Sequence, residues 1–156
     1  EATGYGTVYF AREMLATRGQ SFEGKTVSVS GSGNVAQYAV EKAMELGAKV
    51  VSVSDSSGTV YDAAGFTPEK LAILMDVKNH KYGRVSDYAK LVSGVEFLAG
   101  KSPWSIKVDV ALPCATQNEL NEADAKTLIA LMWLQKWRAG LWSLDWRPAE
   151  SGRPCP

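Results

Sequence analysis

The 156-residue sequence has little cysteine and little histidine: only Cys114, Cys155 and His80. Two cysteines so far apart are too few for a disulfide framework or a zinc site, so we expect a reducing, cytoplasmic setting. No serine or cysteine nucleophile is recognisably paired with His80, and a surface histidine is expected. Cys114, with no histidine partner in view, is expected to be a small buried residue. The sequence therefore gives no support to nucleophile–histidine hydrolysis.

The sequence also lacks an excess of charge of either sign and a long apolar run. Seventeen basic and seventeen acidic residues cancel, so no global field attracts nucleic acid or an anionic membrane. No run approaches the roughly 20 apolar residues of a spanning helix, and the N-terminus does not look like a signal peptide. We expect neither nucleic acid nor a membrane as a partner. The start at Glu1, without methionine, suggests a fragment or a processed product.

What is present is an alternation of strand and helix patterns, enough for one domain. β-branched runs predict strands over 25–30, 48–55 and 107–112, with another possible over 95–98. Apolar periodicity and capping signals predict helices over 7–18, 35–46, 67–80 and 121–130. This order predicts an α/β fold with a Rossmann-like, doubly wound, mostly parallel sheet covered on both faces. The first strand–helix–strand unit should have a right-handed crossover.

A glycine-rich turn joins the first strand to its helix. Gly31-Ser32-Gly33-Asn34-Val35-Ala36 fits the G-x-G-x-x-A pattern of dinucleotide-binding turns. The first glycine allows the tight turn, the second lets a pyrophosphate approach the backbone, and Ala36 lets helix and strand pack closely. Asp55 ends the next strand, 22 residues beyond Gly33, where an acid meets the adenine ribose. The pattern predicts a dinucleotide site.

Residues 131–156 form an atypical tail. Four of the five tryptophans and three of the six prolines lie beyond Ala130. One interpretation is an unusual C-terminal helix, with Trp133 and Trp137 on one face, followed by coil. The other is an altered reading frame that begins near Ala130.

Five blocks of sequence carry a closer likeness. They are EATGYG at 1–6, the run over 22–60, GRVSDYAK at 83–90, the run over 103–120 and DAKTLIA at 124–130. Together they resemble the hexameric glutamate dehydrogenases of bacteria and lower eukaryotes, in particular the NADP-dependent kind. The resemblance implies that 1–130 is an NAD(P)-binding Rossmann-like domain, here incomplete, with 1–20 a leading helix from the interdomain region. An AEGAN-like cofactor loop expected after 130 is replaced by LMWLQKWRAGLW.

The activity implied is the oxidative deamination of L-glutamate to 2-oxoglutarate and ammonia, and its reverse, by a homohexamer. In the family, the catalytic lysine and aspartate belong to an N-terminal domain that this chain does not contain, so no catalytic residue is expected here. Two alternatives stay open: another amino-acid dehydrogenase of the same superfamily, and a non-catalytic nucleotide-binding fragment.

The resemblance also assigns cofactor contacts. Thr3 and Asn34 would contact the nicotinamide cofactor, and Ala115-Thr116-Gln117-Asn118 would lie beside its nicotinamide end. Without the family, Thr3 would be interpreted as a helix cap and the other segment as a polar loop. The phosphate turn itself comprises Gly31, Ser32, Gly33, Asn34 and Val35.

The choice between NADP and NAD depends on a second group of residues. Asp55 could bind a ribose 2′-hydroxyl, which favours NAD. Ser56 and Ser57 can donate to a 2′-phosphate, and Lys78, Lys81 and Arg84 match basic positions of the NADP enzymes' phosphate-binding cluster. The alternative for these three is a solvated surface. We expect NADP. Asp109, within a predicted strand, is expected to be a hydrogen-bonded carboxylate.

Overall fold

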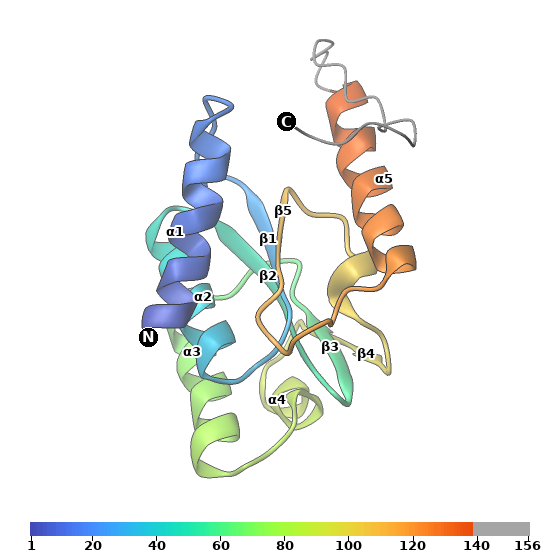
Figure 1. Ribbon diagram of the computed structural model, residues 1–156. Helices are drawn as coiled ribbons and strands as arrows, with labels where there is room; N and C mark the ends of the chain where they lie inside the picture. The colour runs from blue at the N-terminus through green and yellow to red at the C-terminus, as the bar shows by residue number, and fades with distance from the viewer. Residues whose placement is uncertain (139–156) are drawn as a thin grey trace.

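A five-stranded sheet forms the centre of the computed structural model, which describes residues 1–138 (Figure 1). The strands are β1 (Thr26–Val29), β2 (Lys49–Asp55), β3 (Gly58–Tyr61), β4 (Glu96–Ala99) and β5 (Val110–Leu112). Their order in the sheet is β4-β3-β2-β1-β5. β1 pairs in parallel with β2 and β5, whereas β3 is antiparallel to both β2 and β4. Four of these five strands therefore point the same way, and the predicted mostly parallel α/β sheet is confirmed.

Helices cover this sheet on two sides (Figure 1). They are α1 (Ala2–Ala16), α2 (Asn34–Glu45), α3 (Pro68–Met75), α4 (Val85–Leu91) and α5 (Glu122–Arg138), with a π-helical turn over Asp76–His80 and a 3-10 turn over Pro103–Ser105. α2 contacts β1 and β2, and α4 contacts β2, β3 and β4. The 3-10 turn carries the buried Trp104, contacts β1 and β2, and packs against α5, which Figure 1 shows on the side away from α1.

The local signals in the sequence placed several element boundaries correctly. Thr67 Oγ1 accepts a hydrogen bond from the Lys70 N–H at 3.3 Å, and Pro68 is the first residue of α3, as a capped helix start requires. Gly19 ends the first helix with a φ of +63°, where its N–H donates to the Ala16 carbonyl. The predicted helix over 67–80 has the right extent, but its last five residues are π-helical.

Other boundaries were wrong or missed. α1 begins at Ala2 instead of residue 7, and α5 continues to Arg138 instead of ending near 130. β5 is shorter than the predicted 107–112. Strand β3 and helix α4 were not predicted, because each is short and the polar residues around them resemble loops. The tail beyond Arg138 lies outside the described residues.

α1 forms an outer layer that packs on α2 rather than on the sheet. Gly4 makes this possible, because a Cβ there would lie 2.5 Å from the carbonyl oxygen of Val35. Val8, one turn later, is fully buried in the same core as α2. The start of α1 is therefore held against the start of α2, beside the glycine turn. Among residues 1–138, no helix is both long enough and apolar enough to cross a membrane.

Candidate dinucleotide site

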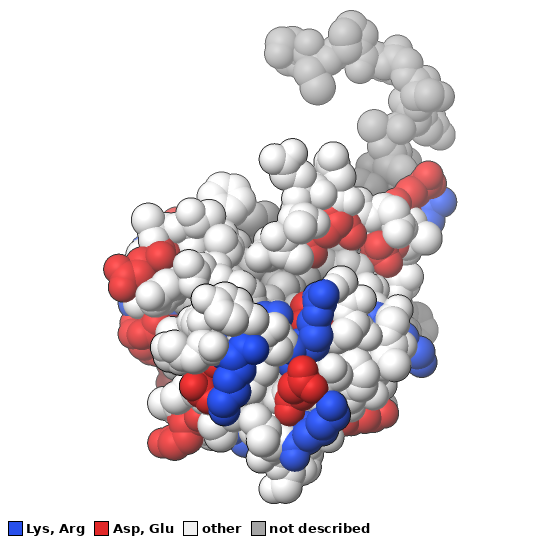
Figure 2. Space-filling model, turned by 90° about the horizontal axis from the view of Figure 1, so that it is seen from below, with Lys and Arg blue, Asp and Glu red and all other residues white. Residues whose placement is uncertain are grey.

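The candidate site lies at the carboxyl ends of three neighbouring parallel strands. β2, β1 and β5 end at Asp55, Val29 and Leu112, and each is followed by a predicted site segment. The chain continues from β1 to β2 on one side, while β5 joins β1 on the other, so the strand order reverses at β1. Open α/β sheets bind ligands at such a reversal. Figure 2 looks toward this end of the molecule and shows Lys and Arg side chains interspersed with Asp and Glu.

Gly31 is required by the fold itself. Its φ is +82°, and a Cβ on it would lie 2.9 Å from the Cys114 carbonyl oxygen and 3.0 Å from the Ala115 Cα. Its N–H donates to Ser54 Oγ at 3.0 Å, and its carbonyl accepts from the Ser54 N–H at 3.1 Å. Only glycine fits this backbone at no cost. Gly31 therefore brings the segment after β5 against the turn after β1.

At position 33, neither the backbone conformation nor the neighbouring residues require a glycine. The φ of −82° and ψ of −170° of Gly33 suit any residue, and within residues 1–138 a Cβ there would meet nothing within 4 Å beyond its two chain neighbours. It precedes α2, whose first N–H groups, those of Asn34, Val35 and Ala36, have no acceptor among the described residues. Helix starts of this kind attract anions through their free N–H groups and partial positive charge. Open space at Gly33 and N–H groups without a described acceptor therefore occur together at the start of α2.

Buried polar residues hold this turn, and the sequence reasoning did not identify them. Gln37 Nε2 donates to the Ser32 carbonyl at 2.8 Å, and Ser30 Oγ accepts from the Cys114 N–H at 2.9 Å. Both side chains belong to residues that are almost fully buried, 1% exposed each. The signal available was a glutamine at an inward position of an otherwise apolar helix face. Such a residue must find hydrogen-bond partners inside the protein.

A second group of predicted residues assembles at the end of β2. Asp55 Oδ1 accepts from the Ser57 N–H at 2.8 Å and from its hydroxyl at 2.6 Å. Oδ2 accepts from Lys78 Nζ at 3.2 Å and from the Val85 N–H at 2.9 Å. Arg84 donates to Ser56 Oγ at 2.5 Å. We call the group formed by Asp55, Ser56, Ser57, Lys78 and Arg84 the Asp55 cluster.

Asp55 is ionised within this cluster. Burial alone would raise the pKa of its carboxyl, but hydrogen bonds from Ser57, Val85 and Lys78 outweigh that effect and hold the pKa below its usual range. The side chain is only 9% exposed, whereas Ser56 and Arg84 lie exposed beside it. The cluster thus presents an exposed guanidinium and hydroxyl above a buried carboxylate that is already neutralised by Lys78.

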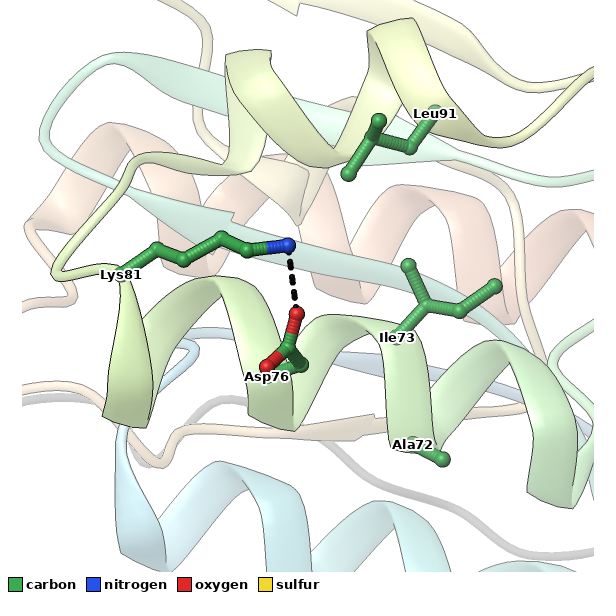
Figure 3. Close-up of a pocket in the computed structure, with 5 residues that line it drawn as sticks. All are labelled: Ala72, Ile73, Asp76, Lys81 and Leu91. Atoms are coloured by element: carbon green, nitrogen blue, oxygen red, sulfur yellow. Dashed lines mark ion pairs between the residues drawn. The ribbon is translucent and has the colours of Figure 1, made fainter.

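Lys81 has a different partner from the rest of the predicted basic group. Its Nζ forms an ion pair with Asp76 at 2.6 Å (Figure 3). Asp76 and Lys81 line a surface hollow together with Ala72, Ile73 and Leu91. The Lys81 side chain is 62% exposed. Lys78 and Arg84 thus contact residues at the end of β2, whereas Lys81 pairs with the first residue of the π-helical turn.

Of the residues predicted for the nicotinamide side, Ala115 lies against Gly31, and Thr3 precedes Gly4, which packs against Val35. Thr3 is in the first turn of α1, where its carbonyl accepts from the Thr7 hydroxyl at 3.0 Å. The interpretation of Thr3 as a helix cap is wrong, because α1 begins at Ala2 and its cap position is Glu1. Thr116 and Asn118 line a hollow beside Pro113, and Asn118 has a φ of +55°.

The remaining candidates behave as expected. Burial, together with the nearby Glu119, raises the pKa of the Cys114 thiol to about 12, which makes it a poor nucleophile. His80 is 77% exposed and lies 3.3 Å from Asp76. Asp109 Oδ2 accepts from the Thr26 N–H and hydroxyl at 2.8 and 2.7 Å, although Asp109 precedes β5 and is not within it.

Within residues 1–138, no group of acids, histidines and cysteines could hold a metal ion.

Comparison with protein families places this geometry in context. The family model described as Glutamate/Leucine/Phenylalanine/Valine dehydrogenase matches residues 1–134. The chain is 67% identical over 129 residues to the NADP-specific glutamate dehydrogenase of Haemophilus influenzae and 63% identical over 130 residues to that of Escherichia coli. These matches cover 83% of this chain but only 28% and 29% of the relatives. The chain thus spans less than a third of their length.

Solved structures agree with the sequence matches. The crystal structure of Plasmodium falciparum glutamate dehydrogenase superimposes with a TM-score of 0.80 at 44% identity. The superposition covers 84% of this chain and 28% of that one. The sheet and helices described above therefore match one segment of that glutamate dehydrogenase.

Proposed function

Because the chain belongs to the Glutamate/Leucine/Phenylalanine/Valine dehydrogenase family, we propose that it is the cofactor-binding part of an NADP-dependent glutamate dehydrogenase. The full enzyme would convert L-glutamate to 2-oxoglutarate and ammonia, and back, as a homohexamer. This chain would supply the nucleotide site within 1–130, with 1–20 as the leading helix. The catalytic lysine and aspartate would come from the rest of the enzyme.

One observation carries the proposal: the space left at Gly33. A glycine kept where neither φ nor a neighbour demands one leaves room for a group from outside the protein. The N–H groups of Asn34, Val35 and Ala36 border that space without acceptors among the described residues. A pyrophosphate supplies the missing acceptors and fits the positive end of the helix. The residues present therefore fit a dinucleotide.

The other predicted residues would hold the two ends of that dinucleotide. Thr3, Asn34 and the segment 115–118 would contact the nicotinamide half, because α1 and the segment after β5 both meet the glycine turn. The nicotinamide ring, when bound, accepts a hydride from the substrate. The residues of this chain would orient that ring and exclude water from one side of it.

NADP is favoured over NAD by the Asp55 cluster. Arg84 and Ser56 are exposed, and a 2′-phosphate could bind both of them through charge-assisted hydrogen bonds. Asp55, which would otherwise repel a phosphate, is buried and paired with Lys78. The two bacterial relatives are named NADP-specific. Lys81 would contribute less, because it is paired with Asp76.

For the tail over 131–156 we keep the hypothesis of an altered reading frame near Ala130. The family model matches as far as residue 134. Translating the encoding DNA in its other two frames should recover an AEGAN-like cofactor loop. Finding no such loop in either frame would contradict the hypothesis.

The cofactor role is tested by titrating the chain with NADPH and following the coenzyme fluorescence. Saturable binding is expected, with no turnover when glutamate and NADP are supplied. A Gly33→Val variant should bind at least about 30-fold more weakly, roughly 2 kcal/mol, because its side chain occupies the phosphate space. Its free energy of unfolding should change by less than about 1 kcal/mol, since no described residue other than its two chain neighbours lies within 4 Å of the Cβ position.

A matched control separates loss of binding from loss of fold. Gly24 has open space around a potential Cβ, like Gly33, but precedes β1 and so lies at the opposite end of that strand from the glycine turn. Asparagine tolerates its φ of +70°, so a Gly24→Asn variant should bind NADPH like the wild type. Unchanged NADPH affinity in Gly33→Val, or no binding by the wild-type chain, would contradict the proposed function.

A further inference from the structure

Gln37 controls both peptide groups that flank Gly33. Its side-chain Nε2 donates to the Ser32 carbonyl at 2.8 Å, and its own backbone N–H donates to the Gly33 carbonyl at 2.9 Å. A carbonyl oxygen only accepts, so the side-chain atom that faces Ser32 must be the amide nitrogen. The side chain of Gln37 is buried, at 1% residue exposure. One residue thus fixes the orientation of two successive peptide planes.

The direction of the free N–H groups follows from peptide geometry. The described peptide bonds are all trans, so the C=O and N–H of each peptide point in opposite directions. The Ser32 carbonyl points toward buried Gln37, and the N–H of Gly33 must therefore point away from it. The Gly33 carbonyl points along α2, and the N–H of Asn34 points the opposite way. Neither N–H has an acceptor among the described residues.

Asn79 fixes the glutamine amide in turn. Gln37 Nε2 donates to Asn79 Oδ1 at 3.2 Å, and Asn79 Nδ2 donates back to Gln37 Oε1 at 3.1 Å. Asn79 lies in the π-helical turn over Asp76–His80, next to Lys78, which holds Asp55 and the Gly83 carbonyl. Two adjacent residues of one turn therefore contact Gln37, which holds the glycine turn, and Asp55. π-helical turns interrupt α-helices frequently at functional sites.

We propose that Gln37, held by Asn79, is a positioning residue that aims the N–H groups of Gly33 and Asn34 at the cofactor pyrophosphate. This inference rests on the proposed function, since it needs a pyrophosphate at Gly33. Gln37 itself is buried beneath the turn and acts only through the main chain. The π-helical turn over Asp76–His80 keeps this main-chain site and the Asp55 cluster in a fixed relation.

The test uses two ligands on the 156-residue chain. NADPH contains the pyrophosphate, whereas adenosine 2′-monophosphate carries the adenine and the 2′-phosphate without it. A Gln37→Met variant keeps the length and bulk of the side chain but loses its amide. It should bind NADPH about 10-fold more weakly, the effect of losing about one aligned hydrogen bond. Its affinity for adenosine 2′-monophosphate should stay within about twofold of the wild type.

Two further variants keep the test decisive. Asn79→Ala, at an exposed position, removes only the second anchor and should weaken NADPH binding about two- to fivefold; it decides the matter if Gln37→Met does not fold. Asn121→Ala, which alters an asparagine at the start of α5, is the control and should bind both ligands normally.

The outcomes separate this inference from the proposed function. If Gly33→Val loses NADPH affinity while Gln37→Met and Asn79→Ala do not, Gln37 has no positioning role and the cofactor proposal stands. If the Gln37 or Asn79 variants lose both ligands equally, their role is general stability and the inference fails. If Gly33→Val binds NADPH normally, the cofactor proposal itself fails.

Discussion

The glycine turn, Gly31–Val35, and the Asp55 cluster lie at neighbouring strand ends but are built in opposite ways. The turn offers the main-chain N–H groups of Gly33, Asn34 and Val35, which cannot bind one another and have no acceptor among the described residues. The cluster offers side chains that already bind one another, with both carboxylate oxygens of Asp55 occupied. The N–H groups of the turn need a ligand to accept their hydrogen bonds, whereas the hydrogen bonds within the cluster stabilise the protein even without a ligand. Mutations should therefore separate binding from stability at the turn and affect both at the cluster.

The largest loss of stability is expected at Gly31, the glycine of the turn that the backbone conformation itself requires. Gly31→Val places a β-branched side chain at a φ of +82° and drives its Cβ against the Cys114 carbonyl. We expect the free energy of unfolding to fall by about 3–4 kcal/mol in urea denaturation. Gly33→Ala, two residues away with an unstrained backbone, should change it by less than about 1 kcal/mol. Equal losses in the two variants would remove the distinction between the glycines.

The next effect tests whether the Asp55 cluster stabilises the protein without a ligand. Asp55→Ala leaves the Val85 and Ser57 donors and the Lys78 ammonium without their acceptor. We expect a loss of about 2–3 kcal/mol in the free energy of unfolding, measured without coenzyme. Glu13→Ala removes an acid from an exposed ion pair with Arg12 and should cost no more than about 0.5 kcal/mol. If Asp55→Ala lowered the free energy of unfolding no more than Glu13→Ala does, the Asp55 cluster would not stabilise the protein and would serve binding alone.

The two regions were also unequally predictable from the sequence. The glycine turn was predicted as a tight connection from strand to helix, and the structure has it there, because such a turn requires particular residue types at fixed spacing. Its supports were not predicted: Gln37 and Asn79 are 42 residues apart and meet only in the folded protein. The same holds for the sheet. Parallel strands β1, β2 and β5 were predicted from β-branched runs, while β3 was missed because its turn residues Ser56 and Ser57 suggested a loop.

The Asp55 cluster illustrates what spacing alone leaves open. Lys78, Lys81 and Arg84 look equivalent along the sequence, but the π-helical turn sends them to different partners. Asp55 was interpreted as a direct ribose ligand, and the structure gives its carboxylate four protein donors. Which acid or base stays free for a ligand depends on long-range contacts. The sequence shows which residue types are present, but not which of them bind one another in the folded protein and which stay available to a ligand.

A smaller effect is expected on coenzyme choice. Arg84→Gln removes the exposed guanidinium beside Ser56, and NADPH affinity should fall about five- to tenfold, or roughly 1–1.4 kcal/mol. NADH affinity should change by less than twofold, because NADH has no 2′-phosphate. Lys81→Gln should change either affinity by less than twofold, since Lys81 is paired with Asp76. Fluorescence titration with NADPH and with NADH measures each variant's affinity relative to the wild type. If Arg84→Gln and Lys81→Gln lowered NADPH affinity equally, the division between the Asp55 cluster and Lys81 would be contradicted.

The smallest effect is a pH dependence that belongs to the cluster and not to the turn. The pKa of Asp55 is lower in the folded protein than in the unfolded chain. The Asp55 carboxylate therefore contributes fully to the free energy of unfolding above the unfolded pKa of about 4. This contribution is lost as the pH falls through the pKa of Asp55 in the folded protein, because the unfolded chain binds the proton more readily. Between pH 6 and pH 3, the free energy of unfolding should therefore fall less in Asp55→Asn than in the wild type, by up to about 1 kcal/mol. Gly33→Ala, which removes no titratable group, should follow the wild-type pH profile in parallel urea titrations, and parallel profiles for all three proteins would assign the acid sensitivity to other carboxylates.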